Sequence, residues 1–220
     1  MKTPDKPKQI RNKELTKRKL IDAVGEILRQ EGYAGLGVNK VAKQAGVTKR
    51  LIYDYFEQDF NRLIEAYILE TDYWMMFADK VKELTDRHAL TDQQKLITDI
   101  LQNQFRYFHL DKQLQQLILW EITAKSPLMR SIHNVRESLG QQLFELTDTH
   151  FNQTHVNFRA VAALLVGGIY YSILHTRHNG GKFSDIDIST EQGREEMLRA
   201  IEMIVSWAFL ASNTNPMSDI

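Results

Sequence analysis

The sequence predicts an all-α protein of about nine helices, and three observations predict it. Apolar residues recur at spacings of three and four, whereas no sustained alternation of β-branched residues favours strands. Only four prolines occur in 220 residues, so long stretches lack a helix breaker. Helix-boundary signals, such as Ser126-Pro127 and Asn179-Gly180-Gly181, separate the apolar stripes.

The expected helices follow one another with short loops. Near the N-terminus we expect a helix over about 13–30, a short one over about 39–44, and a third that Thr48 caps and that ends near Tyr55. A long helix is expected from Phe60 to about Leu84. The later expected helices begin at the capping box Thr91–Gln94, near Leu114, at Ser126-Pro127, near His155, and at a second capping box, Ser189–Gln192.

Charge is distributed unevenly along a chain whose net charge is zero. Of its 28 basic and 28 acidic residues, the first 50 positions hold 13 and 5, which leaves 15 and 23 for the remaining 170. A basic head and an acidic body suit contact between the head and phosphate, although a solvated lysine-rich tail would give the same asymmetry.

Composition also narrows the class of protein. The absence of cysteine excludes disulfides, a thiol nucleophile and thiolate metal sites, and it favours a cytoplasmic location. The most apolar stretch, Val161 to Leu174, falls short of a bilayer span, so no membrane partner is expected. No Gly-rich phosphate loop, nucleophile elbow or HExxH pattern occurs, so we expect neither an enzyme nor a cofactor. The pairs His150/His155 and His175/His178 lack a carboxylate cluster nearby, and we expect no metal site.

The segment from Gly32 to Phe56 has the features of a helix-turn-helix. Small Ala42 and Ala45 stand where two short helices would cross, and Gly46 permits a sharp turn. Val47 and Ile52 are placed to pack against the first helix. The second short helix would present polar and cationic side chains of the kind that enter a major groove.

This segment resembles the N-terminal domain of the TetR/AcrR family of regulators. The matching positions, within about residues 13–65, are Gly32-Tyr33, Val41-Ala42, Ala45-Gly46-Val47-Thr48 and Ile52-Tyr53-Asp54-Tyr55-Phe56. We expect a basic flexible tail over 1–12, and the resemblance implies a helix-turn-helix DNA-binding domain over 13–58 and a larger effector-binding and dimerisation domain over 59–220. It also implies base or phosphate contacts for a set of N-terminal residues. These are Asn39, Thr48, Lys49, Arg50, Leu51, Tyr53 and Tyr55.

Some positions depart from the family pattern. Gly37 stands where the family usually has a threonine that caps a helix and binds phosphate, and Arg50 stands where a small residue is common. Asp54 and Asp59 place acids on the expected DNA-facing side, which would weaken non-specific affinity.

The body is expected to bind an effector and to form a dimer. Candidate pocket residues are Trp74, Phe77, Phe105, Phe108, His109, Trp120, Glu121 and His133, for which ordinary core packing is the alternative. Candidate dimer residues are Gly167, Gly168, Tyr171, Ile201, Val205 and Ala208; for the two glycines, packing within one chain is the alternative.

These expectations combine into one functional hypothesis. The chain would be a sequence-specific regulator of transcription, a ligand-responsive repressor that binds a palindromic double-stranded operator as a homodimer. The alternatives are a helical protein-interaction module and a small-molecule-binding protein without DNA binding.

Overall fold

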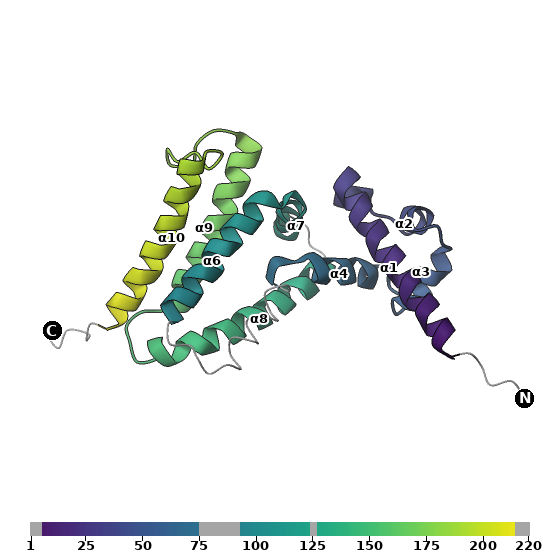
Figure 1. Cartoon of the computed structure of the whole chain (residues 1–220), viewed down its shortest axis with the longest axis horizontal. Coiled ribbons are helices and arrows are strands. Elements are labelled where there is room, and N and C mark those ends of the chain that lie inside the picture. Colours follow the sequence, from purple (N-terminus) through teal and green to yellow (C-terminus); the bar gives the residue numbers. More distant parts are fainter. Residues whose placement is uncertain (1–5, 75–92, 124–126, 214–220) are drawn as a thin grey trace, which may run out of the picture. The chain divides into compact units, whose positions relative to one another are not determined.

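The structure is a computed structural model that describes residues 6–74, 93–123 and 127–213. Within these ranges the regular structure is helical, apart from one isolated bridge between Phe183 and Ile186, and the all-α prediction is confirmed (Figure 1). The described elements are α1 (Lys6–Glu31), the 3-10 helix η1 (Tyr33–Gly35), α2 (Val38–Gln44), α3 (Lys49–Tyr55), α4 (Phe60–Thr71), α6 (Gln93–Leu110), α7 (Lys112–Thr123), α8 (Pro127–Phe151), α9 (Phe158–Asn179) and α10 (Glu191–Ser212).

The chain forms two compact units. Unit 1 comprises Met1–Met75 and Gln116–Val135, and unit 2 comprises Met76–Gln115 and Arg136–Ile220. Unit 1 therefore holds the N-terminal helices together with most of α7 and the first part of α8. Two helices, α7 and α8, contribute residues to both units.

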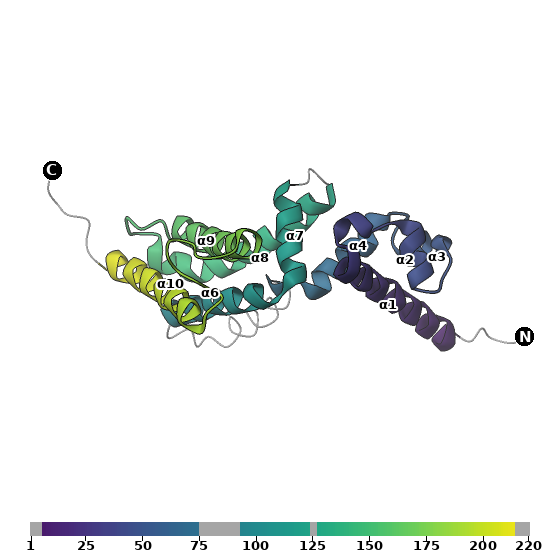
Figure 2. The ribbon, with the colours of Figure 1, turned by 90° about the horizontal axis from the view of Figure 1, so that it is seen from above.

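In unit 1, α1 is the central helix and packs against α2, α3 and α4 (Figure 2). It starts at Lys6, seven residues before the expected position, so the basic segment from Lys6 onward is helical. At Gly25 a side chain would meet the ring of Tyr67 at 2.6 Å, so glycine permits the close approach of α1 and α4. The core residues of this unit include Leu20, Val24, Ile27, Val41, Ile52, Leu63 and Ile68.

The turn between α2 and α3 follows the expected helix-turn-helix geometry. Gly46 has φ 66°, in the left-handed region that glycine adopts without strain, and Val47 N–H donates to the carbonyl of Ala42 at 3.0 Å. Thr48 is the residue before α3, as expected, but its side chain makes no capping hydrogen bond. The hydroxyl of Thr48 is therefore not used to cap α3.

The helix that begins at Phe60 ends earlier than expected. The prediction of one continuous helix to about Leu84 is wrong, because α4 ends at Thr71 and Asp72 is extended, with ψ 133°. The carboxylate of Asp72 accepts a hydrogen bond from Trp74 N–H at 2.9 Å, as the residue before a new helical segment does. Asp favours such positions because its side chain competes for main-chain donors. Residues 75–92, and with them the end of the expected helix and the start of the Thr91–Gln94 capping box, lie outside the described residues.

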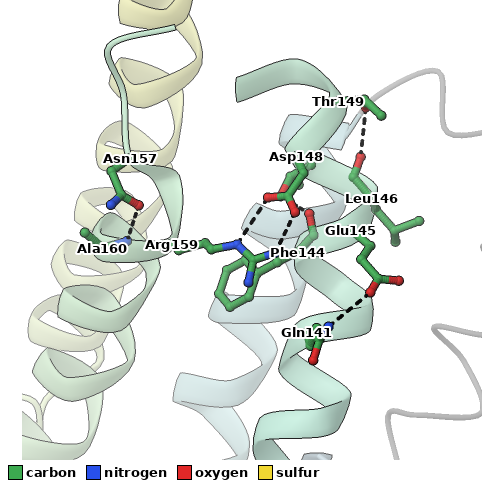
Figure 3. Close-up of polar contacts among 10 residues, drawn as sticks. Gln141, Phe144, Glu145, Leu146, Asp148, Thr149, Asn157, Arg159 and Ala160 are labelled. Carbon is green, nitrogen blue, oxygen red and sulfur yellow. Dashed lines mark hydrogen bonds and ion pairs between the residues drawn. The ribbon is translucent and has the colours of Figure 1, made fainter. Parts of the chain in front are cut away.

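Unit 2 is built around α6, which packs against α9 and α10 (Figure 1). The side-chain amide of Gln102 donates to the carbonyl of Leu198 on α10 at 2.9 Å. The loop between α8 and α9 is held by Arg159, whose guanidinium forms two hydrogen bonds to Asp148, while Asn157 caps α9 through Ala160 N–H (Figure 3). The aromatic cluster beside this loop consists of His150, Phe151, Phe158 and Phe209.

Helix α10 begins one residue later than the second expected capping box predicts. Thr190, rather than Ser189, is the N-cap, and its hydroxyl accepts from Gly193 N–H at 3.0 Å. Gln192 therefore does not occupy the position that a capping box requires. A side chain at residue 193 would meet the carbonyl oxygen of Asp187 at 1.9 Å, so glycine is required there by the close loop.

By length and composition, α9 is apolar enough to cross a membrane, contrary to the expectation for Val161 to Leu174. Its helical length is 22 residues, longer than the apolar stretch in the sequence. Within unit 2 it packs on α6 and α10 and buries residues such as Leu165, Ile169 and Ile173, which is how a core helix of a globular unit behaves.

Candidate nucleic-acid interface

The first residues of α3 combine exposed cationic side chains with a buried anchor. Lys49 and Arg50 are the first two residues of the helix, and both are exposed. Ile52, one turn from Thr48, is fully buried in the core of unit 1. Leu51 is half-buried. The buried anchor thus fixes the orientation of a short helix that presents two cations to solvent.

Arg50 is paired on its own helix. Its guanidinium lies 3.5 Å from the carboxylate of Asp54, one turn along, while 87% of the Arg50 side chain stays exposed. Such an exposed pair contributes little stability, so Arg50 is free to exchange Asp54 for another hydrogen-bond acceptor. Asp54 lowers the net positive charge of this face, as its sequence position indicates.

The two tyrosines of α3 are half-buried. Tyr53 and Tyr55 each present part of the ring to solvent, and the ammonium group of Lys13 lies 5.4 Å from the centre of the Tyr55 ring. This cation–π contact joins α1 to the end of α3 and was not expected from the sequence. Phe56, directly after α3, is buried and belongs to the core.

The start of α2 lies in the same helix-turn-helix. Asn39 is the second residue of α2 and is exposed. Gly37 is the N-cap, in extended backbone, and supplies no side-chain cap. A Cβ at Gly37 would meet no heavy atom within 4 Å, so the structure has room for a serine or threonine side chain at this position.

Ion pairs on α1 and α4 support this domain. Arg18 joins Asp22 on its own helix to Glu70 on α4, and hydrogen bonds to both carboxylates raise the pKa of Arg18. Arg62 pairs with Glu65 at 2.8 Å and with Glu57 at 3.6 Å. The mostly buried carboxylate of Glu65 also accepts a hydrogen bond from the hydroxyl of Ser131 on α8.

The residues expected to line an effector pocket divide between the units. Trp74, Trp120, Glu121 and His133 belong to unit 1, Phe105, Phe108 and His109 to unit 2, and Phe77 lies outside the described residues. Trp120 stacks on Tyr33 of η1, with ring centroids 4.2 Å apart. Glu121 lies 3.8 Å from His133, whose side chain is mostly exposed. In unit 1 these residues therefore hold α7 to η1 and to α8.

The three residues in unit 2 differ in exposure. Phe105 and Phe108 are fully buried, and Phe108 contacts the ring of Tyr170 on α9. His109 is half-buried beside Phe105. Burial lowers the pKa of His109, and the positive charges of Arg194 and Arg177 lower it further.

The expected dimer residues also separate into two groups. Gly167, Gly168 and Tyr171 are exposed on α9. Ile201, Val205 and Ala208 are instead buried within their own chain and cannot form an outward face. The exposed apolar residues of α10 are Met203, Trp207 and Leu210, which follow the same spacing two residues later.

Two of the paired histidines make contacts with polar side chains. His150 Nε2 lies 2.7 Å from the hydroxyl of Ser212, and His175 Nδ1 lies 3.2 Å from the amide of Asn179. Over the described ranges, no group of three or more His, Asp or Glu side chains is arranged to hold a metal ion.

Comparison with known proteins finds a family model that matches part of the chain. Residues 20–58 match the family model described as bacterial regulatory proteins, tetR family. No curated protein matches the chain in sequence.

Three solved structures show the same fold. FadR from Bacillus subtilis, in complex with stearoyl-CoA, has a TM-score of 0.59 at 17% identity and covers 87% of this chain and 97% of its own. FadR from Bacillus halodurans has a TM-score of 0.57 at 17% identity, with 88% and 94% covered. A TetR family transcription regulator from Marinobacter aquaeolei VT8 has a TM-score of 0.56 at 16% identity, with 91% and 97% covered.

The structure combines a helix-turn-helix with a helical body. The matched segment contains all of α2 and α3, including the turn at Gly46. Residues 20–58 thus match the tetR family model, and the solved structures show that the chain shares the fold of TetR-family regulators.

Proposed function

We propose that the chain is a cytoplasmic, ligand-responsive repressor that binds a palindromic operator in double-stranded DNA as a homodimer. The observation that supports DNA binding is that Lys49 and Arg50 are exposed at the start of α3, while Ile52 on the same helix is buried. A helix that presents its first residues in this way suits reading of base edges in a major groove. Asn39, Thr48, Leu51, Tyr53 and Tyr55 would add contacts to bases or phosphates.

An exposed apolar face supports the homodimer. Leu164 and Tyr171 on α9 flank the exposed Gly167 and Gly168, and Trp207 lies on α10 in the same unit. A smooth, glycine-containing helix surface allows a second copy to approach closely, and two such faces can bury the more than about 1,000 Å² that a stable interface needs. Palindromic half-sites about one DNA turn apart require two copies of α3, which a two-fold dimer supplies.

A small-molecule effector is supported by the relatives and by the shared helices. The FadR structure from Bacillus subtilis holds stearoyl-CoA, and RolR, with a TM-score of 0.51 at 15% identity, holds resorcinol. In this chain α7 and α8 have residues in both units. A ligand that shifts their unit 2 residues would move Trp120 and Ser131, which contact Tyr33 and Glu65 in unit 1. Release of DNA would follow as a shift between two populations.

The proposed DNA binding is tested by selecting the sequences that the protein binds from a pool of random DNA duplexes. The purified protein should enrich a palindrome whose half-sites have centres about 10 base pairs apart. Lys49→Ala/Arg50→Ala should enrich no sequence, whereas Lys112→Ala/Arg177→Ala, which removes the same charge from exposed sites in unit 2, should enrich the same palindrome as wild type. Equal enrichment by both variants would contradict the assignment of α3, and selection of no DNA by wild type would favour a protein-interaction module.

A further inference from the structure

Buried polar side chains in unit 2 are few, and nearly all of them are bonded to the main chain. Among the described residues of this unit they are Thr98, Gln104, Gln115, Thr147 and Ser172. Thr98, Thr147 and Ser172 each donate a hydroxyl proton to a carbonyl of their own helix. Gln115 donates to the carbonyls of Phe108 and His109, at 2.7 and 3.1 Å.

Gln104 is different. It lies on α6, is 1% exposed, and neither its Oε1 nor its Nε2 has a hydrogen-bond partner, which holds for no other buried side chain that the structure describes. By helical spacing it is flanked by Ile100, Leu101 and Phe108, all buried, on the face of α6 opposite Gln102, which bonds to α10. A buried amide without partners destabilises the fold, so a purely structural role would favour leucine here.

The surroundings of Gln104 restrict what it can bind. No charged side chain is fully buried among the described residues of unit 2, so a charged ligand group beside Gln104 would have no buried counter-ion there. The amide offers one acceptor and two donor protons, so it pairs best with a group that both donates and accepts. The flanking residues are hydrocarbon and aromatic, which suits an apolar ligand body.

We propose that Gln104 is the polar specificity residue of the effector site, and that the effector is an uncharged apolar molecule with one donor–acceptor group, of the chemical class of an alkyl carboxamide. This inference rests on the proposed effector response. Gln104 would hold the ligand's carbonyl with Nε2–H and accept the ligand's N–H with Oε1, in a planar two-bond pair.

The first test is stability without ligand. Gln104→Leu removes two unpaired polar atoms and should raise the Tm of the full chain by about 2–8 °C. Gln115→Leu is the matched control, because Gln115 is equally buried but bonded to two carbonyls, and it should lower the Tm. A lowered Tm for Gln104→Leu would mean that Gln104 is bonded within the fold, for instance through a buried water, and would overturn the proposal.

The second test uses alkanamides from hexanamide to dodecanamide, with the carboxylates of the same chain lengths at pH 8 as the charged comparison. Calorimetry on wild type should find at least one amide that binds ten-fold or more tightly than its carboxylate. Gln104→Leu should weaken that amide at least ten-fold. Binding of no amide, or equal binding by wild type and variant, would overturn the proposal.

A third measurement separates this inference from the proposed function. Gln104→Leu should bind the selected DNA as wild type does, but octanamide or whichever amide binds should no longer release it. Release from wild type and from the variant at the same amide concentration would overturn the role of Gln104 while leaving the effector response intact. The effect of Lys49→Ala/Arg50→Ala on DNA binding tests only the proposed DNA-binding residues and does not bear on the role of Gln104.

Discussion

The ring of Tyr33 stacks on the indole of Trp120, with centroids 4.2 Å apart and planes inclined by 25°. Tyr33 lies in η1, directly after α1, and Trp120 lies on α7. The contact therefore joins the helix-turn-helix domain to a helix of the body within unit 1.

This stack should contribute measurable coupling. Tyr33→Leu and Trp120→Leu should each destabilise the chain, and the double variant should lose less than the sum, by about 0.5–1.5 kcal/mol. Urea unfolding of the four proteins measures this coupling. A sum that is strictly additive would show that the two rings do not interact in solution.

The Arg50–Asp54 pair should weaken DNA binding at the proposed interface. Asp54→Asn removes the negative charge that lies 3.5 Å from Arg50 and should tighten DNA binding and steepen its dependence on salt. Stability should change by less than about 1 kcal/mol, because the pair is exposed. Titrations of the selected duplex at several salt concentrations test both effects, and weaker binding by the variant would argue that Asp54 itself contacts the DNA.

Substitution of Gly37 and of Gly46 should change stability in opposite directions, although a Cβ at either position would meet no heavy atom within 4 Å. Gly37 is in extended backbone at the N-cap of α2, so Gly37→Ser should stabilise the chain by a few tenths of a kcal/mol and supply a hydroxyl for phosphate. Gly46 has φ 66°, so Gly46→Ser should destabilise by about 1–2 kcal/mol. Chemical denaturation compares the two directly, and equal effects would contradict the assigned backbone geometry.

The exposed face of α9 and α10 should control assembly. Leu164→Asp should convert the proposed dimer to monomers in sedimentation equilibrium, because it places a charge on the proposed interface. Leu110→Asp is the control, since both leucines are 78% exposed in one chain and Leu110 lies on α6. Dissociation by both variants, or by neither, would contradict the assignment of this face.

His109 should make stability depend on pH. Its pKa is lowered in the folded chain, so the unfolded chain binds the proton more tightly and stability falls as pH drops below about 6.5, the ordinary value for histidine. His109→Gln should therefore lose less stability than wild type between pH 7.5 and 5.5. His178→Gln, at an exposed position, should behave as wild type. Identical losses in all three proteins would remove His109 as the cause.

The helix-turn-helix could be predicted from local sequence. The small Ala42, the turn at Gly46 and the apolar Ile52 act over a few residues, so their spacing was sufficient to predict the geometry observed. The break after Thr71 was missed because the apolar pattern continues through it, while the helix end depends on one aspartate, Asp72.

Features that depend on tertiary packing could not be predicted from the spacing of apolar residues. On α10 the buried Ile201, Val205 and Ala208 and the exposed Met203, Trp207 and Leu210 have identical spacing, so periodicity could not decide which stripe faces outward. A glutamine in a helix reads as a surface residue, and only tertiary packing shows that Gln104 is buried without a partner.

The central claim is most directly tested by fluorescence anisotropy with the duplex just upstream of the protein's own gene, compared with a random duplex at two salt concentrations. We predict tight, salt-sensitive and sequence-selective binding by wild type, and loss of that selectivity in Lys49→Ala/Arg50→Ala. Absence of binding to either duplex at low salt would contradict the account.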